Sequence, residues 1–222
     1  MICLEGLTFT YRNQPSGGAL FAPLSHTFPD GRVTAVMGES GVGKTTLLNL
    51  LAKILTPADG ILSGAVTGNE NGCVYLFQED RLLPALTVFE NIAVVADEGK
   101  SKRGVNAADF PHRKRILAIL GAMGIADSAF DSIDKLSGGM KRRVALARAL
   151  FFATLPQNAL LPVLLDEPFK GLDAETAAGV SAYLFAELTA TSRPVIFVTH
   201  SDAEAAPFDI LRVQPTRERS DL

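Results

Sequence analysis

A glycine-rich stretch, GESGVGKTT at residues 38–46, constrains the fold of this chain more than any other feature. It follows an apolar run at residues 33–37 that predicts a buried strand. Leucines at helical spacing come directly after it and predict a helix, which we expect to end at Pro57 because proline does not continue a helix. A strand, a glycine turn and a helix in this order are the setting that a phosphate-binding loop requires.

The stretch fits the pattern Gly-x-x-x-x-Gly-Lys-Thr, in which backbone N–H groups and a helix N-terminus converge on an anion. Lys44 would neutralise the β- and γ-phosphates of a nucleotide, Thr45 would ligate Mg²⁺, and Thr46 would donate to the α-phosphate. The alternative is a structural turn that ends in Lys-Thr. The loop does not specify the reaction, because kinases, GTPases and many ATPases share it. The residues predicted to bind nucleotide here are Gly38, Ser40, Gly41, Gly43, Lys44, Thr45 and Thr46.

Further apolar runs alternate with helical patterns along the chain. The runs at 162–166 and 194–199 begin with proline and predict strands buried on both faces of a sheet, and 71–78 predicts another strand. Helical character extends over about 85–150 and recurs after Asp173, which fits an N-cap. Strands that alternate with helices predict an α/β fold with a parallel sheet, into which a helical block is inserted.

Composition excludes several classes of function. The net charge of −3 and the pI of about 5.6 give no overall electrostatic attraction to nucleic acid. The basic clusters at 112–115 and 141–143 predict solvated helix faces, with a polyanion site as the alternative. Cys3 and Cys73 lack the spacing of a metal site or a disulfide framework and suit a reducing compartment. We expect a cytosolic chain, since the sequence has neither a signal peptide nor an apolar run of about 18 residues.

Six features outside the loop occur in one order along the chain. They are Tyr11, Gln78 in FQED, LSGGM at 136–140, PVLLDEP at 162–168, GLD at 171–173 and VTH at 198–200. Each is weak alone, but together with the loop they resemble ATP-binding cassette (ABC) proteins over essentially the whole chain. The resemblance implies an α/β fold of the P-loop NTPase (RecA-like) type, with a parallel-sheet core, an N-terminal antiparallel β part and an inserted α-helical subdomain. It also implies a single ABC ATPase domain over 1–222, with the core at 1–84 and 151–222 and the helical signature subdomain at about 85–150.

The resemblance gives catalytic roles to residues near the end of the chain. Asp166 would hold the water shell of Mg²⁺ opposite Thr45, and Glu167 would be the general base for the attacking water. His200 would bond to the γ-phosphate and fix that water. Taken alone, Asp166 fits a helix cap equally well, and a lone histidine is more often structural or exposed. The predicted catalytic residues are Glu167, His200 and Lys44, and the predicted metal ligands are Thr45, Gln78 and Asp166.

The remaining site residues have roles in the family for which simpler alternatives exist. Tyr11 would stack on adenine, or be an ordinary strand-end aromatic. Gln78 would sense the γ-phosphate or Mg²⁺, or be a polar residue at a strand end. The serine and glycines at 137–139 would contact ATP bound to a partner subunit, or form a plain N-cap. The residues predicted to bind nucleotide outside the loop are Tyr11, Gln78, Ser137, Gly138, Gly139 and Asp173.

The sequence departs from the usual family pattern at two places. Met140 stands where the family usually has glutamine, and residues 170–173 read KGLD instead of SALD or GALD. We expect activity to be retained, because the position of Met140 points less directly at phosphate than Ser137 or Gly139.

Separate ATP-binding subunits of this size are typical of the bacterial importers in the family. The resemblance therefore implies an ATPase that binds ATP and Mg²⁺, pairs with itself or with a second cassette, and drives solute import through a separate transmembrane permease. It would lie at the cytoplasmic face of the inner membrane, with a solute-binding protein as an indirect partner and no nucleic acid partner. The nitrate, sulfonate and taurine importers look most similar.

Three other functions stay open at this point. They are an ABC ATPase that acts on nucleic acid or the ribosome, a small-molecule kinase with a phosphate loop, and a non-enzymatic nucleotide-binding module. Segment 79–136 is too short for the coiled coils of chromosome-maintenance relatives, and a kinase has no use for LSGGM or VTH. A group of apolar residues after Gln78 either lines a groove for the permease or belongs to the core: Leu82, Leu83, Leu86, Val88 and Phe89.

Overall fold

The structure is a computed structural model that describes residues 1–12, 18–56, 58–96, 107–108 and 110–216. The chain divides into two compact units. The core unit comprises Met1–Tyr75, Leu160–Glu167 and Thr191–Leu222, and the helical unit comprises Leu76–Ala159 and Pro168–Ala190.

The helical unit is larger than the predicted helical subdomain at about 85–150. It also includes residues 76–84, 151–159 and 168–190. The last of these belongs to it because α5 (Ala174–Thr189) packs against α4 (Gly138–Ala153). The description of the chain as one domain with an inserted subdomain stays a prediction.

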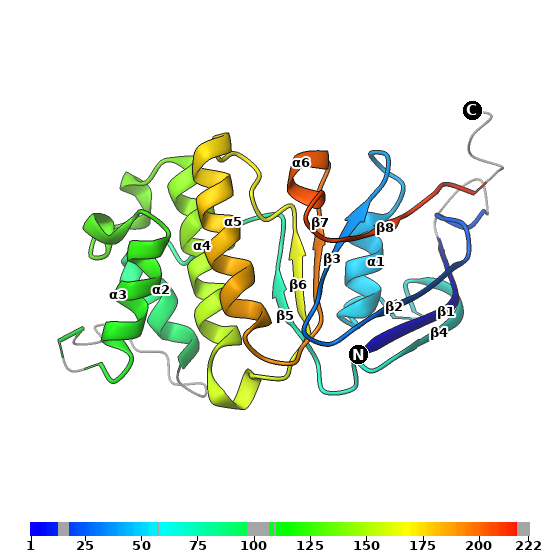
Figure 1. The fold of residues 1–222 in the computed structure, drawn as a ribbon, viewed down its shortest axis with the longest axis horizontal. Coiled ribbons are helices and arrows are strands. Elements are labelled where there is room, and N and C mark those ends of the chain that lie inside the picture. The colour runs from blue at the N-terminus through cyan, green and yellow to red at the C-terminus, as the bar shows by residue number, and fades with distance from the viewer. Residues whose placement is uncertain (13–17, 57, 97–106, 109, 217–222) are drawn as a thin grey trace. The chain divides into compact units, whose positions relative to one another are not determined.

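Five strands form one sheet, in which β6, β7, β3 and β8 pair in parallel (Figure 1). All of their residues lie in the core unit except the last residue of β5. The residues of β3, β6 and β7 are all buried, as expected for a sheet that is covered on both faces. Pro162 and Pro194 lie one residue before their strands rather than at the first position, and the carbonyl oxygen of Pro194 accepts a hydrogen bond from the N–H of Val163 at 3.0 Å. In order across the sheet, the strands are β5 (Val74–Leu76), β6 (Val163–Asp166), β7 (Val195–Val198), β3 (Val33–Met37) and β8 (Asp209–Arg212).

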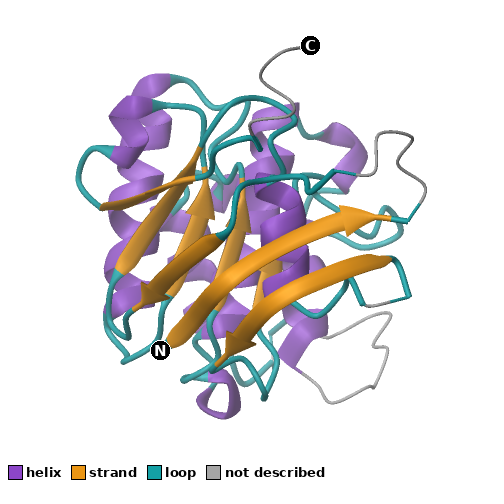
Figure 2. Ribbon diagram, turned by 90° about the vertical axis from the view of Figure 1, so that its right-hand side faces the viewer, coloured by secondary structure: helices purple, strands orange, loops and turns teal. Residues whose placement is uncertain are grey.

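A second, antiparallel sheet has β1 at its centre, which confirms the predicted N-terminal antiparallel part. The buried positions of β1 shift from even to odd residues at an irregularity between Leu4 and Leu7, where Gly6 has a φ of 57°. In Figure 2 the long strands of this sheet cross in front of the parallel strands. The strands are β2 (Leu24–Phe28), β1 (Ile2–Tyr11) and β4 (Gly60–Thr67), in order across the sheet.

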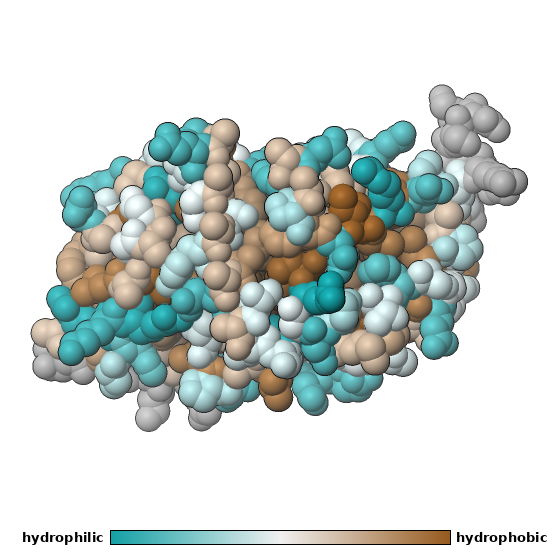
Figure 3. All heavy atoms as spheres, viewed as in Figure 1, coloured by the Kyte–Doolittle hydropathy of each residue, from teal (hydrophilic) through white to brown (hydrophobic). Residues whose placement is uncertain are grey.

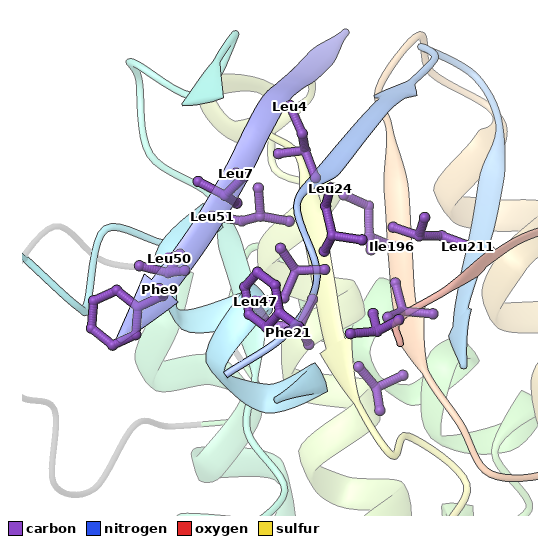
Figure 4. Close-up of a cluster of buried hydrophobic side chains, with 14 of the residues drawn as sticks. Leu4, Leu7, Phe9, Phe21, Leu24, Leu47, Leu50, Leu51, Ile196 and Leu211 are labelled. Atoms are coloured by element: carbon purple, nitrogen blue, oxygen red, sulfur yellow. The ribbon is translucent and has the colours of Figure 1, made fainter. Parts of the chain in front are cut away.

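The apolar core of this unit forms around helix α1 (Lys44–Leu51), which lies between the two sheets (Figure 1). Side chains from both sheets point toward the leucines of the helix (Figure 4). The burial of such side chains is the main source of stability in a unit of this size. Members of the cluster include Leu4, Leu7, Phe9, Phe21, Leu24, Leu47, Leu50, Leu51, Ile196 and Leu211.

Helix α1 ends earlier than predicted. Its last residue is Leu51, and the chain then turns through Lys53, whose φ of 56° is left-handed. Leu55, which the leucine spacing placed on the helix, packs against the core from beyond the helix end. Pro57, which lies outside the described residues, is therefore not what ends the helix.

Among the described residues of the helical unit, helix α4 contacts three other α-helices. The ring of Phe89 on α2 lies 5.8 Å from the rings of Phe110 and Phe130, and the side chains of Ile116 and Leu120 on α3 are fully buried. The α-helices are α2 (Val88–Ala93), α3 (Arg113–Ala122), α4 and α5, and short 3₁₀ helices cover Val94–Ala96, Ala126–Ser128, Ile133–Lys135 and Pro156–Asn158.

The structure corrects the prediction for one of the two basic clusters. The cluster at 141–143 is not a solvated face, because Arg142 is only 3% exposed.

The apolar residues that follow Gln78 do not all have the same surroundings. Val88 and Phe89 belong to the core, whereas Leu83 is 43% exposed.

Polar and apolar side chains are mixed over the face shown in Figure 3, with small apolar patches between them. Within the described ranges, no helix combines the length and the apolar character that crossing a membrane requires. Cys3 and Cys73 are both free thiols, and burial raises the pKa of the Cys73 thiol to about 11.

Candidate nucleotide-binding site

The predicted phosphate loop connects β3 to α1, and its backbone requires glycine at two positions. A Cβ atom on Gly38 would lie 2.5 Å from the carbonyl oxygen of Val213. At Gly43, where φ is 105°, a Cβ atom would lie 2.6 Å from Cδ2 of Leu20. The glycine spacing of the sequence therefore follows from close backbone packing and a left-handed turn.

Lys44 is the first residue of α1 and is only 5% exposed. Its ammonium donates hydrogen bonds to the carbonyl oxygens of Gly38 at 2.9 Å and Glu39 at 2.8 Å. Burial lowers the pKa of Lys44, and the negative charges of Glu167 and Asp166 act in the opposite direction. The structure thus brings the lysine of the loop and both predicted carboxylates into one electrostatic site.

The two threonines that follow Lys44 differ in their surroundings. Thr45 is exposed, whereas Thr46 is 7% exposed. The hydroxyls of Thr46 and Tyr11 form a hydrogen bond of 2.9 Å, and the Tyr11 ring meets the Phe9 ring edge to face at 4.9 Å. Sequence reasoning missed the bond between Tyr11 and Thr46, because the two residues lie on separate elements. Their predicted contacts with adenine and the α-phosphate stay predictions.

The predicted base and the predicted switch histidine meet at the ends of neighbouring strands. Nε2 of His200 lies 3.2 Å from Oε1 of Glu167. Strands β6 and β7 pair in parallel with Asp166 opposite Val198, and the N–H of Glu167 donates to the carbonyl oxygen of Val198 at 3.1 Å. Strand pairing therefore brings together two residues that are far apart in the sequence.

Glu167 has an unusual backbone. Its φ of 46° lies in the left-handed region, where few residues other than glycine are found. The side chain is 18% exposed, whereas that of His200 is 47% exposed. A residue held in this conformation at the end of a buried strand is typical of a functional site.

The residues on either side of His200 are fixed by hydrogen bonds that sequence reasoning missed. The hydroxyl of Thr199, which is 3% exposed, donates to the carboxylate of Glu204 and accepts from the N–H of Ser201 at 3.0 Å. The Ser201 hydroxyl caps α6 (Asp202–Ala205) by accepting from the N–H of Glu204 at 3.3 Å. The spacing of Ser201 and Glu204 is that of a capping box and was the available signal.

Two of the predicted Mg²⁺ ligands lie in the core unit. Thr45 is an exposed residue with a hydroxyl, and Asp166 has its carboxylate at the end of β6. The part of the chain that the structure describes has no group of three or more His, Cys, Asp or Glu side chains that could hold a metal ion. Oxygen donors in small number fit Mg²⁺, which usually binds one or two protein groups together with water and phosphate. Gln78, the third predicted ligand, belongs to the helical unit.

The helical unit has a helix N-terminus at the predicted signature residues. The hydroxyl of Ser137 caps α4 by accepting from the N–H of Met140 at 3.2 Å. Ser137 and Gly138 are exposed, so the first N–H groups of α4 are accessible to an anion. A Cβ atom on Gly139 would lie 3.3 Å from the carbonyl oxygen of Gly171, which explains a small residue at this position.

Gln78 and Asp173, the two remaining residues predicted to bind nucleotide, also lie in the helical unit. Asp173 caps α5 as predicted, because its carboxylate accepts from the N–H of Thr176 at 2.9 Å, and this bond lowers the pKa of Asp173. The side chain of Gln78 is exposed, and its backbone carbonyl accepts from Arg142. Contacts of Gln78 or Asp173 with nucleotide stay predictions.

A glycine loop between a parallel strand and a helix, with a buried lysine and two carboxylates, defines a nucleotide-binding protein of the P-loop NTPase class. A family model described as ABC transporter matches residues 21–170. The chain belongs to this family, which confirms the predicted family and fold class.

Known relatives agree with this assignment. The chain is 41% identical over 178 residues to an aliphatic sulfonates import ATP-binding protein, SsuB 1, of Mesorhizobium japonicum, and the match covers 80% of this chain and 62% of that protein. It is 35% identical over 208 residues to a taurine import ATP-binding protein, TauB, of Pseudomonas aeruginosa, with 90% of this chain and 73% of that protein covered. A solved dimeric structure of a bacterial ABC transporter cassette has a TM-score of 0.77 and 25% identity, covering 96% of this chain and 94% of that chain.

Proposed function

We propose that this chain is the ATP-binding and ATP-hydrolysing subunit of a bacterial ABC importer, working as a pair of cassettes with a separate permease. Family membership and relatives named as import ATP-binding proteins support this function. The observation that carries it is the contact of Glu167 with His200 at 3.2 Å, in the unit that also contains Lys44 of the phosphate loop.

The residues of the core unit divide the reaction between them. The loop N–H groups and the Lys44 ammonium bind the triphosphate and oppose the charge that develops on it. Glu167 orients the attacking water and accepts its proton, while His200 holds Glu167 and the γ-phosphate in place. Thr45 and Asp166 would hold Mg²⁺, which supplies charge neutralisation on the phosphates when bound.

In this proposal, residues of the helical unit bind the ATP that a second copy of the chain holds. The exposed N-terminus of α4 at Ser137 would bind the γ-phosphate of ATP held by the partner subunit. The dimeric assembly of a solved cassette supports a pair with two shared nucleotide sites. Tyr11, Gln78 and Asp173 would complete each site as predicted from the sequence.

The names of the relatives support a proposal for the transported solute and for the location in the cell. We propose a sulfonate or taurine as the solute, delivered by a solute-binding protein to the permease. The subunit would then lie at the cytoplasmic face of the inner membrane. Stimulation of ATP hydrolysis by a co-purified membrane protein would support this function, whereas stimulation by DNA or ribosomes, or transfer of phosphate to a small acceptor, would favour one of the alternatives.

Glu167→Gln tests the proposed base. We expect the variant to bind ATP and to form a stable dimer, but to hydrolyse ATP about 10²- to 10⁴-fold more slowly, because the amide does not accept the proton. ATP binding is measured by calorimetry, dimer formation by size-exclusion chromatography with ATP, and turnover by phosphate release.

The matched control is Glu175→Gln, an exposed glutamate in the first turn of α5, which should leave turnover unchanged. Turnover of Glu167→Gln at the level of the unaltered protein would reject Glu167 as the base.

A further inference from the structure

One buried arginine of α4, Arg142, binds backbone carbonyls of two segments that are far apart in the sequence. The side chain of Arg142 is 4% exposed. Its guanidinium donates to the carbonyl oxygens of Phe77 at 2.8 Å, Gln78 at 3.2 Å and Pro168 at 3.0 Å. Pro168 is the residue that follows Glu167 in the chain. All four of the residues in contact, Arg142 and its three acceptors, belong to the helical unit.

The charge of Arg142 has a partner in the same segment. Its Nη1 lies 3.2 Å from Oδ1 of Asp80. A buried guanidinium without such a partner would be costly, and removal of one partner of a buried pair usually destabilises the other. The planar guanidinium has five N–H donors, which is why one side chain can bind several carbonyl oxygens and a carboxylate at once.

A second arginine of α4 fixes the rest of the segment at residues 77–81, which we call the Gln78 segment. Arg148 donates to the carbonyl oxygens of Asp80 at 2.8 Å and Arg81 at 3.0 Å. Within the segment, Arg81 has a φ of 45° and its guanidinium lies 3.6 Å from the centre of the Phe77 ring. Four of the five carbonyls of the segment are therefore bound by side chains of α4, the helix that Ser137 caps.

We propose that Arg142 is a positioning residue for ATP hydrolysis, which acts by fixing the backbone of Gln78 to helix α4. The inference rests on the proposed role of Gln78 in the nucleotide site. The Gln78 side chain is exposed, so the place of its amide depends on the backbone to which it is attached. Without the guanidinium, the carbonyls of Phe77 and Gln78 lose the hydrogen bonds from Arg142, so this end of the segment is held less firmly to α4.

Arg142→Gln tests this role, with Arg143→Gln as the matched control. Arg143 is the next residue on the same helix. It donates to the carbonyl oxygens of Met123 at 3.0 Å and Gly124 at 3.2 Å, and at 3.4 Å to that of Gly139 one turn earlier in α4, but not to the Gln78 segment. Both variants lose an arginine that binds backbone carbonyls, but only one loses contact with Gln78.

We expect Arg142→Gln to lower kcat roughly 10- to 100-fold, the scale of a displacement of about 1 Å in a reacting group. Its KM for ATP should stay within about threefold, because the phosphate loop belongs to the core unit and its binding is not altered. Hydrogen exchange should become faster at the amides of residues 77–81 in Arg142→Gln and not in Arg143→Gln, which should keep its kcat within about threefold.

A double variant separates positioning from general stability. If Arg142 acts through Gln78, Arg142→Gln should lower kcat by less than about twofold in a Gln78→Ala background. Additive losses, equal kcat losses in the Arg142 and Arg143 variants, or an unchanged kcat of Arg142→Gln would each overturn the inference while leaving the proposed function intact. Normal turnover of Gln78→Ala itself would reject the proposed role of Gln78, and the inference with it.

Two milder variants test whether Arg142 is a positioning residue if Arg142→Gln does not fold. Arg142→Lys keeps the charge and loses the fork of donors, and Asp80→Asn keeps the carbonyl bonds and loses the charge partner. A lowered kcat of Arg142→Lys with an unchanged KM would support the inference, and a normal kcat in both variants would overturn it.

Discussion

Lys44 shows how a single buried charge is accommodated in the phosphate loop. Its ammonium bonds to two carbonyl oxygens of the loop, and the carboxylates of Glu167 and Asp166 act on it through space. A buried ammonium needs such compensation, because removal from water disfavours its charged form. The triphosphate of a nucleotide would add negative charge at the same place, so binding and charge compensation are linked at this residue.

Lys44→Ala should therefore weaken ATP binding. We expect the Kd to rise about 10- to 100-fold, the usual loss for hydrogen bonds to a charged group. Calorimetry or a fluorescent nucleotide measures the change, with Lys114→Ala, an exposed lysine of α3, as the control. A Kd that is the same in both variants would contradict the assignment of the phosphate loop.

Secondary structure was predictable where local pattern and long-range packing agree. Strand β3 covers Val33–Met37 as predicted, because a short apolar run between turn residues fits an interior strand of a sheet that is covered on both faces. The cap of α5 by Asp173 was predictable for the same reason, since a capping aspartate acts within one turn.

The contacts that position the candidate site were less predictable. Arg142 has acceptors more than 60 residues earlier in the chain, at Phe77 and Gln78, and no local pattern distinguishes it from a solvated arginine. The left-handed turn at Lys53 likewise ends α1 before the leucine pattern ends. The motifs identified the residues of the site, whereas the bonds that hold them depend on tertiary structure.

The N-terminus of α4 combines a structural cap with a proposed ligand contact at Ser137, and two substitutions separate these roles. Ser137→Asp should keep the free energy of unfolding near its original value, because aspartate caps helices as well as serine does. It should nevertheless abolish most ATP hydrolysis, since its carboxylate would repel the triphosphate. Ser137→Ala should lose about 1 kcal/mol of stability from the missing cap.

Urea unfolding and phosphate release measure the two effects independently. If Ser137→Asp hydrolyses ATP normally, α4 begins with a plain cap and the proposed nucleotide contact is wrong.

At the scale of the whole molecule, the proposal divides each nucleotide site between two copies of the chain. A mixture of Lys44→Ala and Ser137→Asp chains tests this division. Each variant alone should be nearly inactive, but a mixed dimer contains one site with both an intact loop and an intact signature. With random pairing and independent sites, mixing should restore about a quarter of the original activity.

Restored hydrolysis is measured on the mixture after ATP is added, and the unmixed variants at the same total concentration are the control. Sites that lie within one chain predict no restoration at any mixing ratio.

The left-handed backbone of Glu167 has a consequence for evolution and engineering. A residue other than glycine pays about 1 kcal/mol or more for this conformation, so the native state is less stable than its packing alone would allow. Glycine or asparagine would relieve this cost and would remove the proposed base. A library screened only for survival of heat should therefore become enriched in inactive sequences at position 167, and melting temperature would be a misleading guide to ATP hydrolysis.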